Sequence, residues 1–540
     1  MTDLDSPSAV ADNNSLGGGE LRRLARGGSL SLVGVMANAI LGFLFVGLLS
    51  HTLVVGTAGA LFEAIAIFTI CSNATELGAD TGLLRLMTIY RRRHPSDLRR
   101  LTLVAFVPAF VCSSIAAFLV ILYAPQLTHV FVHKAPHADT PTDLRILAAF
   151  LAAQTTETVL ATGIRSWSIK PFISIIYFFV PLSRIVLLGI VYAIGLTPRL
   201  AAVAWAAPIG VAFVMVVVMT EVYLRRESHR RPPPAHGQAH DPPSSYRSIA
   251  RKFWTFSLPR SLGGLFQILI VWFGILLVGA YTSAHDAAAY TVASRYLIVG
   301  TFPVLAVGFA IAPQIVRLMD GRDRAEARNL YSVSTWWVMA ASWPILLSLA
   351  IFAPFFTALF GHKYQIADTA LVILSLSTLA NTGTGCNGMV LLMAGRSGVN
   401  LAMAGIGLAI NVGLGVLLIP HLGLTGAAIG WTATILFSAA FASTLLWKLY
   451  RISPFGPGYP RIAAAAILCY AVPGLVLRLA FGARPLTFAA FAVVSSVLYA
   501  GALWFWRRDF HLDAFSSLVV RIRPGAQSAA AVVREADPVA

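Results

Sequence analysis

The chain has 540 residues, of which 57% are hydrophobic and only 12% are charged, and its mean hydropathy is +0.75. Soluble globular chains carry about 45–50% apolar and about 25% charged residues, so the composition excludes an ordinary soluble domain and indicates a membrane protein with many spans. The formal net charge of +17 lies in short clusters between apolar runs, which argues against a nucleic-acid-binding face.

The first 27 residues are polar and acidic, without the pattern of a cleaved signal peptide, and we expect a disordered cytoplasmic tail. Apolar stretches of about 20 residues, the length of a spanning helix, then recur along the chain. They predict an all-α integral membrane protein with fourteen spans: 28–50, 57–78, 101–123, 143–165, 171–194, 200–223, 253–280, 286–313, 331–359, 368–394, 398–419, 423–447, 462–482 and 486–506.

Lysine and arginine are unevenly shared between the loops at the two ends of these spans. With a cytoplasmic N-terminus, the cytoplasmic loops hold the clusters at 91–93, 99–100, 225–226 and 230–231. The opposite loops hold few basic residues: Lys134, Arg145, Arg199, Lys363, Arg478 and Arg484. Because positive charge is retained on the cytoplasmic side, this asymmetry predicts that both termini are cytoplasmic.

Short segments of the first half recur in the second half at a nearly constant offset of about 226–232 residues. For example, "GLTPRLAAVAW" (195–205) matches "GLTGAAIGW" (423–431). The offset predicts two six-helix lobes in the same orientation, a transporter design whose binding site lies between the repeats. The predicted organisation is a tail (1–27), an N-terminal lobe (28–223), a cytoplasmic linker (224–251), a C-terminal lobe (252–448), two extra helices (449–507) and a cytoplasmic tail (508–540).

Motifs typical of soluble enzymes do not fit their context in this sequence. "GTGCNG" (383–388) matches GxGxxG but lies inside a predicted span, so we interpret it as small residues at a close helix contact or kink. His236 and His240 lie in the Pro-rich linker, where no helix would hold them toward a metal. We therefore expect a protein that is not an enzyme and has no metal and no cofactor.

Charged residues inside spans are expensive and mark functional sites by default. Glu157 and Arg184 lie at similar depth on consecutive spans and could neutralise one another. Arg295 lies about 15 Å from the outer end of span eight at 1.5 Å per residue, and either pairs with Glu63 or stays free for an anionic ligand. Arg260, near the inner end of span seven, is a second candidate cation for a ligand or an ordinary interfacial arginine.

Glu76 and Asp80 close the second span, where they are followed by Arg85 and further arginines. A solvated helix end, a catalytic acid pair and a membrane-orientation signal compete to explain this charged stretch, and the arginines after Arg85 are chiefly an orientation signal. The two acids can form i, i+4 and cross-helix pairs with Arg85 and its neighbours. We favour a cytoplasmic gate whose pairs break when the lobes move, with plain helix-end capping as the alternative.

Two local motifs resemble a known family. Residues 76–85, "ELGADTGLLR", join an acid, Leu-Gly, a second acid, small residues and an arginine, and span eight carries small residues between Tyr290 and Arg295. A proline and a basic turn follow at 313–322. Together with the duplication, these motifs resemble the polysaccharide transporter (Wzx-like) family of the multidrug/oligosaccharidyl-lipid/polysaccharide (MOP) flippase superfamily over roughly residues 28 to 450.

The resemblance implies two lobes around a central cavity lined mainly by spans one, two, seven and eight. It implies export of a lipid-linked oligosaccharide or polysaccharide precursor across the bacterial cytoplasmic membrane by alternating access. An arginine in such a cavity would replace part of the hydration of a diphosphate. The candidate substrate-binding residues are Arg295 and Arg260, and the candidate coupling or gating residues are Glu63, Glu76, Asp80, Glu157 and Arg184.

Two other functions fit the sequence. A cation-coupled drug or metabolite antiporter of the same superfamily would use Glu63 or Glu157 as its coupling carboxylate. A membrane-embedded polysaccharide polymerase or ligase would need a larger outward loop than the longest one here, at 124–143. The expected partners are the lipid bilayer, a lipid-linked sugar and polysaccharide-assembly proteins, and no nucleic acid.

Overall fold

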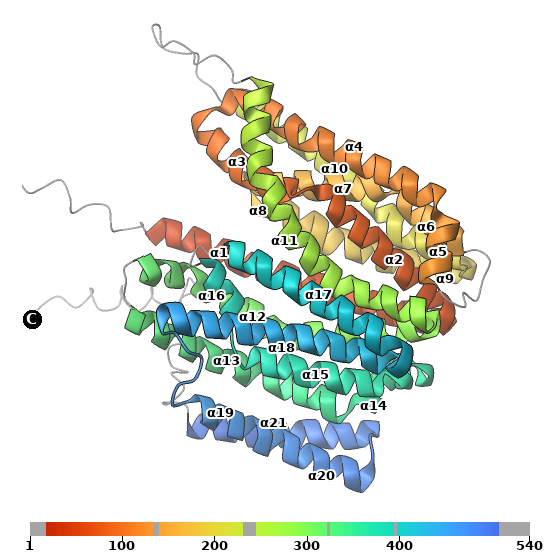
Figure 1. Ribbon diagram of the computed structural model, residues 1–540, viewed down its shortest axis with the longest axis vertical. Helices are drawn as coiled ribbons and strands as arrows, with labels where there is room; N and C mark the ends of the chain where they lie inside the picture. The colour runs from red at the N-terminus through yellow and green to blue at the C-terminus, as the bar shows by residue number, and fades with distance from the viewer. Residues whose placement is uncertain (1–17, 133–139, 230–244, 321–323, 394–396, 507–540) are drawn as a thin grey trace, which may run out of the picture.

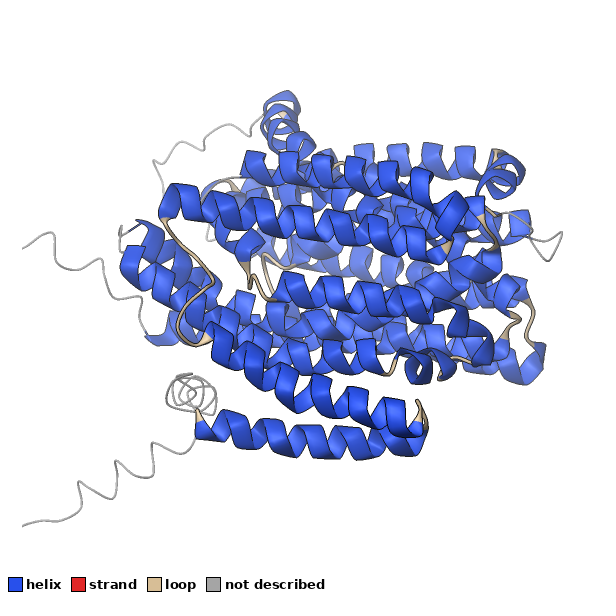
Figure 2. Cartoon of the chain, turned by 60° about the horizontal axis from the view of Figure 1, so that its bottom comes forward, coloured by secondary structure: helices blue, strands red, loops and turns tan. Residues whose placement is uncertain are grey.

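The computed structural model of the chain describes residues 18–132, 140–229, 245–320, 324–393 and 397–506. All regular structure in these ranges is helical, and Figure 2 shows long helices running side by side with short loops between them. Thirteen helices are long and apolar enough to cross a membrane, and one bent pair raises the number to 14. The predicted all-α fold class with about fourteen spans is therefore confirmed, and the chain is a multi-pass membrane protein.

The first half of the chain forms ten α-helices and two short helical segments of other pitch. They are α1 (Gly18–Thr52), α2 (Val55–Glu76), α3 (Ala79–Arg93), η1 (Pro95–Asp97), α4 (Leu98–Leu122), α5 (Ala124–Phe131), α6 (Thr140–Ala149), α7 (Leu151–Ile164), α8 (Ile169–Phe172), η2 (Ile173–Phe179), α9 (Val180–Gly195) and α10 (Pro198–His229).

The second half begins with two helices of more than 35 residues. Its elements are α11 (Tyr246–Tyr281), α12 (Ala284–Asp320), α13 (Arg324–Ile351), α14 (Ala353–Ala358), η3 (His362–Ala367), α15 (Asp368–Thr382), α16 (Asn387–Met393), α17 (Ser397–Leu422) and α18 (Leu424–Tyr450). The C-terminal pair consists of α19 (Tyr459–Ala466), η4 (Ile467–Ala471) and α20 (Val472–Phe481), followed by α21 (Pro485–Phe505).

Several predicted boundaries need correction. Helix α1 starts at Gly18, so the predicted disordered tail is helical from residue 18, and residues 1–17 lie outside the described part. Helix α10 continues into the predicted linker as far as His229. Helix α11 begins at Tyr246, also within the predicted linker. The remaining linker residues, including His236 and His240, and the predicted C-terminal tail (508–540) lie outside the described part. Hydropathy locates the apolar part of a helix and misses its polar ends, which continue the same backbone hydrogen bonding.

Figure 1 shows two layers of helices, with α2 to α10 above and α12 to α18 below. Helix α11 crosses between them. Near its start, a Cβ on Gly78 of the upper layer would lie 2.4 Å from the carbonyl oxygen of Ser257, and near its end Leu277 packs on Gly415 of α17. Pro259 lies inside α11. The helix that opens the predicted C-terminal lobe thus packs on both layers.

The two layers meet most closely where α2 and α12 begin, at the right of Figure 1. A Cβ placed on Gly59 would lie only 1.7 Å from the carbonyl oxygen of Ala284, so the two backbones are in direct contact. Phe43 of α1 packs edge-on against Tyr296 and Phe360, with ring centroids 5.1 and 5.3 Å apart. One continuous hydrophobic core therefore joins both layers at this end of the bundle, which we call the closed end.

The C-terminal pair packs on α13 through an aromatic cluster. The rings of Phe352 and Phe491 lie 4.8 Å apart, and the Tyr499 hydroxyl donates a hydrogen bond to the carbonyl of Ala340 at 3.1 Å. The opposite face is apolar and exposed, with Leu479 85% and Leu486 83% exposed. In a membrane protein such a face contacts lipid acyl chains.

The "GTGCNG" segment forms the break between α15 and α16, whose axes differ by 44°. Gly385 has φ of +68°, a left-handed conformation that costs a non-glycine residue about 1 kcal/mol or more. A Cβ at this position would also lie 2.2 Å from the Thr335 hydroxyl oxygen. The interpretation of this motif as a helix kink with close packing is confirmed.

Candidate functional site

Arg295 lies eleven residues after the first residue of α12, about 16 Å along the helix axis and hence near the middle of a bilayer about 30 Å thick. Its guanidinium lies over the ring of Trp272 on α11, 4.7 Å from the ring centroid. Its Nε is buried and has no hydrogen-bond partner. Among the described residues no carboxylate lies within 4 Å of it, so the sequence-based alternative of an Arg295–Glu63 pair is wrong in this conformation.

The free-energy cost of burying Arg295 is compatible with a role in binding a ligand. Burying an arginine at the centre of a spanning helix costs about 2.5–3.5 kcal/mol on insertion scales. A desolvated cation–π contact returns about 2 kcal/mol, which offsets most of this cost. The contact with Trp272 uses the face of the guanidinium and leaves its in-plane N–H donors for an anion. The arrangement suits a receptor for a phosphate or carboxylate.

Glu63 lies on α2 at the closed end. It is 0% exposed, and neither carboxyl oxygen has a hydrogen-bond partner. A Cβ on Gly279 of α11 would lie 2.1 Å from its Oε1, so Glu63 packs directly against the α11 backbone. A buried polar group without a partner costs about 1–3 kcal/mol, and Glu63 therefore favours the opening of this contact to water. That position suits a residue that adjusts the balance between two conformations.

Glu157 and Arg184 are near enough for their charges to attract, but they form no ion pair within 4 Å. Arg184 Nε instead donates a hydrogen bond to the carbonyl of Trp205 at 2.9 Å, and its guanidinium lies 4.0 Å from the centroid of the same indole ring. Arg184 is thus held by α10, and the direct pair expected as one possibility from the sequence is absent. Glu157 is buried, and its Oε2 has no hydrogen-bond partner.

Glu76 and Asp80 flank a break in the second span. Leu77 and Gly78 have φ of +52° and +70°, so α2 ends and α3 starts there, with Asp80 in the first turn of α3. The partial positive charge at the start of a helix stabilises an acid in this position. Glu76 and Asp80 lie close enough to repel one another when both are ionised, and Arg260 of α11 lies close enough to attract an ionised Asp80 without forming an ion pair within 4 Å.

Arg85 does not pair with these acids. Its guanidinium lies 4.2 Å from the centroid of the Phe256 ring on α11, and no ion pair joins it to Glu76 or Asp80 within 4 Å in the described residues. The pairing of these acids with Arg85 that the sequence suggested is therefore absent in this conformation, because the break at residue 77 turns α3 toward α11 and brings Arg85 to the Phe256 ring. The acids do lie where α3 meets α11, as a gate would require.

A cavity of about 330 Å³ lies beside Asp80, between α3, α7 and the segment formed by α8 and η2. Its polar lining consists of Asp80, Thr81, Thr158, Thr162, Arg165 and Tyr177. Neither Arg165 nor Tyr177 was among the candidate site residues from the sequence. Their proximity to Asp80 depends on the packing of three spans, and no spacing in the sequence predicts it.

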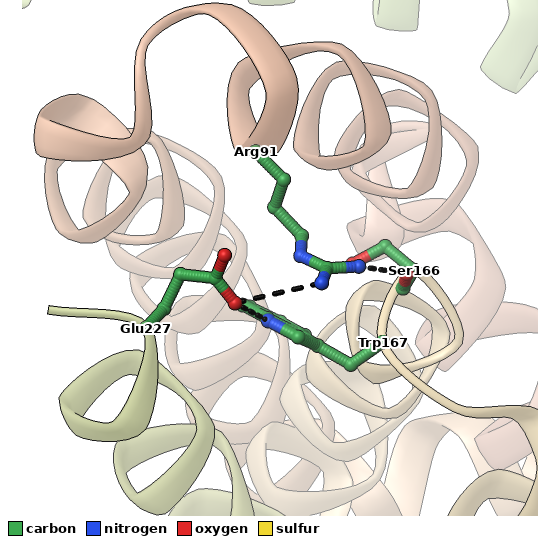
Figure 3. A network of polar contacts seen from close by, with 4 residues as sticks. All are labelled: Arg91, Ser166, Trp167 and Glu227. Carbon is green, nitrogen blue, oxygen red and sulfur yellow. Dashed lines mark hydrogen bonds and ion pairs between the residues drawn. The ribbon is translucent and has the colours of Figure 1, made fainter. Parts of the chain in front are cut away.

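A network of polar contacts fixes the turn that follows Arg165, as Figure 3 shows. Arg91 donates to the carbonyl of Ser166 and lies 3.5 Å from Glu227 Oε2, while the Trp167 indole N–H donates to the same Glu227 oxygen at 2.9 Å. Arg91 also lies over the Trp167 ring at 5.1 Å. These contacts join the end of α3, the turn after α7 and the end of α10, and so hold Arg165 in place at the edge of the cavity.

Comparisons with known proteins agree with this architecture. The MatE family model matches residues 259–417. A curated relative, the probable lipid II flippase MurJ of Rhizobium meliloti (strain 1021), is 27% identical over 279 residues, which is 47% of this chain and 50% of the relative. The alignment thus spans about half the length of that protein.

Solved structures match over most of the chain. The lipid II flippase MurJ in an inward closed conformation matches with a TM-score of 0.68 at 11% identity, over 88% of this chain and 98% of that one. An inward-facing multidrug resistance MATE transporter of the MOP superfamily matches with a TM-score of 0.57 at 16% identity, over 81% of this chain and 96% of that one. A mutant of the Vibrio cholerae MATE transporter VcmN matches with a TM-score of 0.55 at 17% identity, over 80% of this chain and 98% of that one.

The chain has the MurJ/MATE fold. The MatE match and the curated relative support the resemblance at the level of the MOP superfamily, whereas no comparison names the Wzx-like branch. The relatives found are flippases and transporters rather than enzymes. Within this fold, Glu63 and Arg295 lie on α2 and α12, which pack on one another and on α11, whereas Asp80 and Arg260 lie at the contact of α3 with α11.

Proposed function

We propose that the protein is a flippase that moves a lipid-linked oligosaccharide or polysaccharide precursor across the cytoplasmic membrane by alternating access. The observation that carries this proposal is Arg295, a guanidinium near mid-membrane that stacks on Trp272 and has no carboxylate within 4 Å in the described chain. A diphosphate that crosses the bilayer needs such a donor in place of water. The curated relative described above, a probable lipid II flippase, also supports the proposal.

The proposed cycle uses the contacts between the helix layers. At the closed end, α2 and α12 meet at Gly59, and the unpartnered Glu63 lowers the cost of separating them. At the other end, Asp80 and Arg260 provide an attraction between α3 and α11 that would be broken and remade. Alternate opening of the two ends would expose Arg295 first to one leaflet and then to the other.

A transport assay tests the proposal. The native protein is reconstituted into vesicles of phosphatidylethanolamine and phosphatidylglycerol that carry a fluorescent polyprenyl diphosphate sugar in one leaflet. We expect the sugar to reach the other leaflet faster than in protein-free vesicles, in assays run with and without an imposed membrane potential and proton gradient. Equal rates under all conditions would refute the flippase function.

A cation-coupled antiporter is the second candidate, because Glu63 is a buried carboxyl group without a partner and the MatE model matches the second half of the chain. The same vesicles distinguish the two functions. An antiporter would accumulate a fluorescent organic cation such as ethidium when a proton gradient is imposed, and it would leave the polyprenyl diphosphate sugar in its original leaflet.

We further propose that both termini and the 224–251 segment face the cytoplasm, because the basic residues concentrate on that side. Gln238→Cys should react with a membrane-impermeant maleimide only after the cells are permeabilised. Val54→Cys, in the exposed turn between α1 and α2, is the matched control and should react in intact cells. Labelling of residue 238 in intact cells would reverse the proposed topology.

A further inference from the structure

The cavity beside Asp80 combines groups that recognise a phosphorylated sugar. Arg165 is its cation, and Thr158, Thr162 and Tyr177 contribute hydroxyl groups. The Thr158 hydroxyl donates its hydrogen to the carbonyl of Gln154 at 3.0 Å and accepts one from Gln154 Nε2 at 3.3 Å, so one lone pair of its oxygen remains for a ligand hydroxyl. A carboxylate, hydroxyls and a guanidinium together can satisfy both the hydroxyl and the phosphate groups of such a ligand.

Arg165 is available to an anion. Its guanidinium lies over the Phe172 ring at 4.8 Å, and none of the described carboxylates is within 4 Å. Asp80 lines the same cavity without forming an ion pair with it. The contacts of Ser166 with Arg91 and of Trp167 with Glu227 fix the following turn, so the guanidinium is held before any ligand binds. Such preorganisation lowers the entropy lost on binding.

Size limits the ligand to a single unit. A volume of about 330 Å³ lies at the lower end of the range for small-molecule sites, roughly 300–1,000 Å³. One sugar ring with its phosphate is the right class of ligand, whereas an oligosaccharide is too large. The cavity borders α1, because Tyr177 and Ile173 pack against Gly34. The hydrocarbon tail of a lipid-linked sugar could thus extend along α1 into the bilayer.

We propose that this cavity binds the first sugar and the adjoining phosphate of the lipid-linked substrate, with the phosphate on Arg165 and the sugar hydroxyls on Asp80 and Thr158. The inference rests on the proposed function and adds a second binding position, separate from Arg295. The cavity lies beside the turn at 165–168, where α7 ends, whereas Arg295 lies near mid-membrane. The substrate would occupy the two positions one after the other.

Binding to the full-length protein in nanodiscs tests the proposal. The probes are geranyl diphosphate linked to glucose, to galactose or to N-acetylglucosamine, and geranyl diphosphate without a sugar. We expect Arg165→Ala to weaken binding of at least one glycosylated probe by about tenfold or more, the loss of one charge-assisted hydrogen-bonded pair. Arg165→Lys should lose less binding affinity, because lysine keeps the positive charge. Lys170→Ala, which removes an exposed cation five residues away, is the matched control and should bind like the native chain.

Two further measurements locate the site. Asp80→Asn should weaken binding of the glycosylated probe and leave binding of unglycosylated geranyl diphosphate unchanged. The Thr162→Cys variant should react with a thiol reagent more slowly when the glycosylated probe is present, and the native chain provides the background labelling. Native affinity in Arg165→Ala together with unchanged labelling at 162 would overturn the cavity proposal.

The outcomes separate this inference from the proposed function. If Arg165→Ala binds normally but Arg295→Ala does not, the cavity proposal fails and the flippase proposal stands. If the native protein binds none of the glycosylated probes, the flippase proposal fails, and the cavity proposal fails with it.

Discussion

Gly59→Ala is expected to prevent the closed end from forming. The added Cβ would lie 1.7 Å from the carbonyl oxygen and 2.5 Å from the carbonyl carbon of Ala284. Non-bonded heavy atoms prefer separations of about 3.5–4.0 Å, so α2 and α12 must move apart by about 1.5–2 Å at this point. Both obstructing atoms belong to the backbone, and no rotamer change relieves them. Overpacking of this kind costs about 1–3 kcal/mol and occasionally more, which is about a 5- to 150-fold change in the population of the closed state.

Spin labels at Val54 and Tyr281, both exposed at the closed end, report this change as a distance distribution in a cysteine-free background. We expect Gly59→Ala to shift the distribution to longer distances and to slow transport, because alternating access needs both conformations. Gly264→Ala is the matched control, since a Cβ there has no heavy atom within 4 Å. A native distance distribution in Gly59→Ala would contradict the prediction, and membrane abundance shows whether the variant folds.

Arg295→Ala is expected to abolish transport with little loss of protein. The variant removes the mid-membrane cation together with its contact to Trp272. A desolvated cation–π contact contributes about 2 kcal/mol, but burial of the charge costs about 2.5–3.5 kcal/mol, so the folded state loses nothing on balance. The substrate loses a bidentate donor. Arg295→Lys keeps the charge without the planar fork and should transport at an intermediate rate.

Arg184 is the matched control, because it also stacks on a tryptophan inside a span. Its Nε is bonded to the Trp205 carbonyl, whereas the Nε of Arg295 has no partner. Arg184→Ala should therefore lower the melting temperature and membrane abundance and leave transport per molecule near the native value. The vesicle assay, read with protein abundance, measures both variants. Native transport by Arg295→Ala would remove this residue from the substrate path and favour the antiporter.

Local sequence was sufficient for the number and type of spans. A helix must satisfy its backbone hydrogen bonds within the bilayer, so about 20 consecutive apolar residues specify a span without reference to the rest of the chain. The kink at 383–388 could be predicted for the same reason, because a cluster of glycines acts on its own backbone. The ends of α1, α10 and α11 were misplaced because polar helical turns carry no hydropathy signal.

Side-chain partners could not be predicted in this way. The composition of a span identifies Arg295 as a buried cation, but the contact with Trp272 depends on how α11 packs against α12. The contact that Arg85 makes also depends on how the helices pack. The sequence suggested that Arg85 pairs with the acids at the end of the second span, but the left-handed residues at 77 and 78 turn it toward Phe256.

By itself, the sequence determined that this protein is an all-α membrane protein with buried charges at Glu63, Glu157, Arg184 and Arg295, because hydropathy and charge are properties of each segment alone. Only the tertiary structure decided which of these charges has a protein partner and that Arg165 and Asp80 line one cavity. Contacts between spans depend on the shapes of several helices at once, and small residues such as Gly59 set how closely those helices approach.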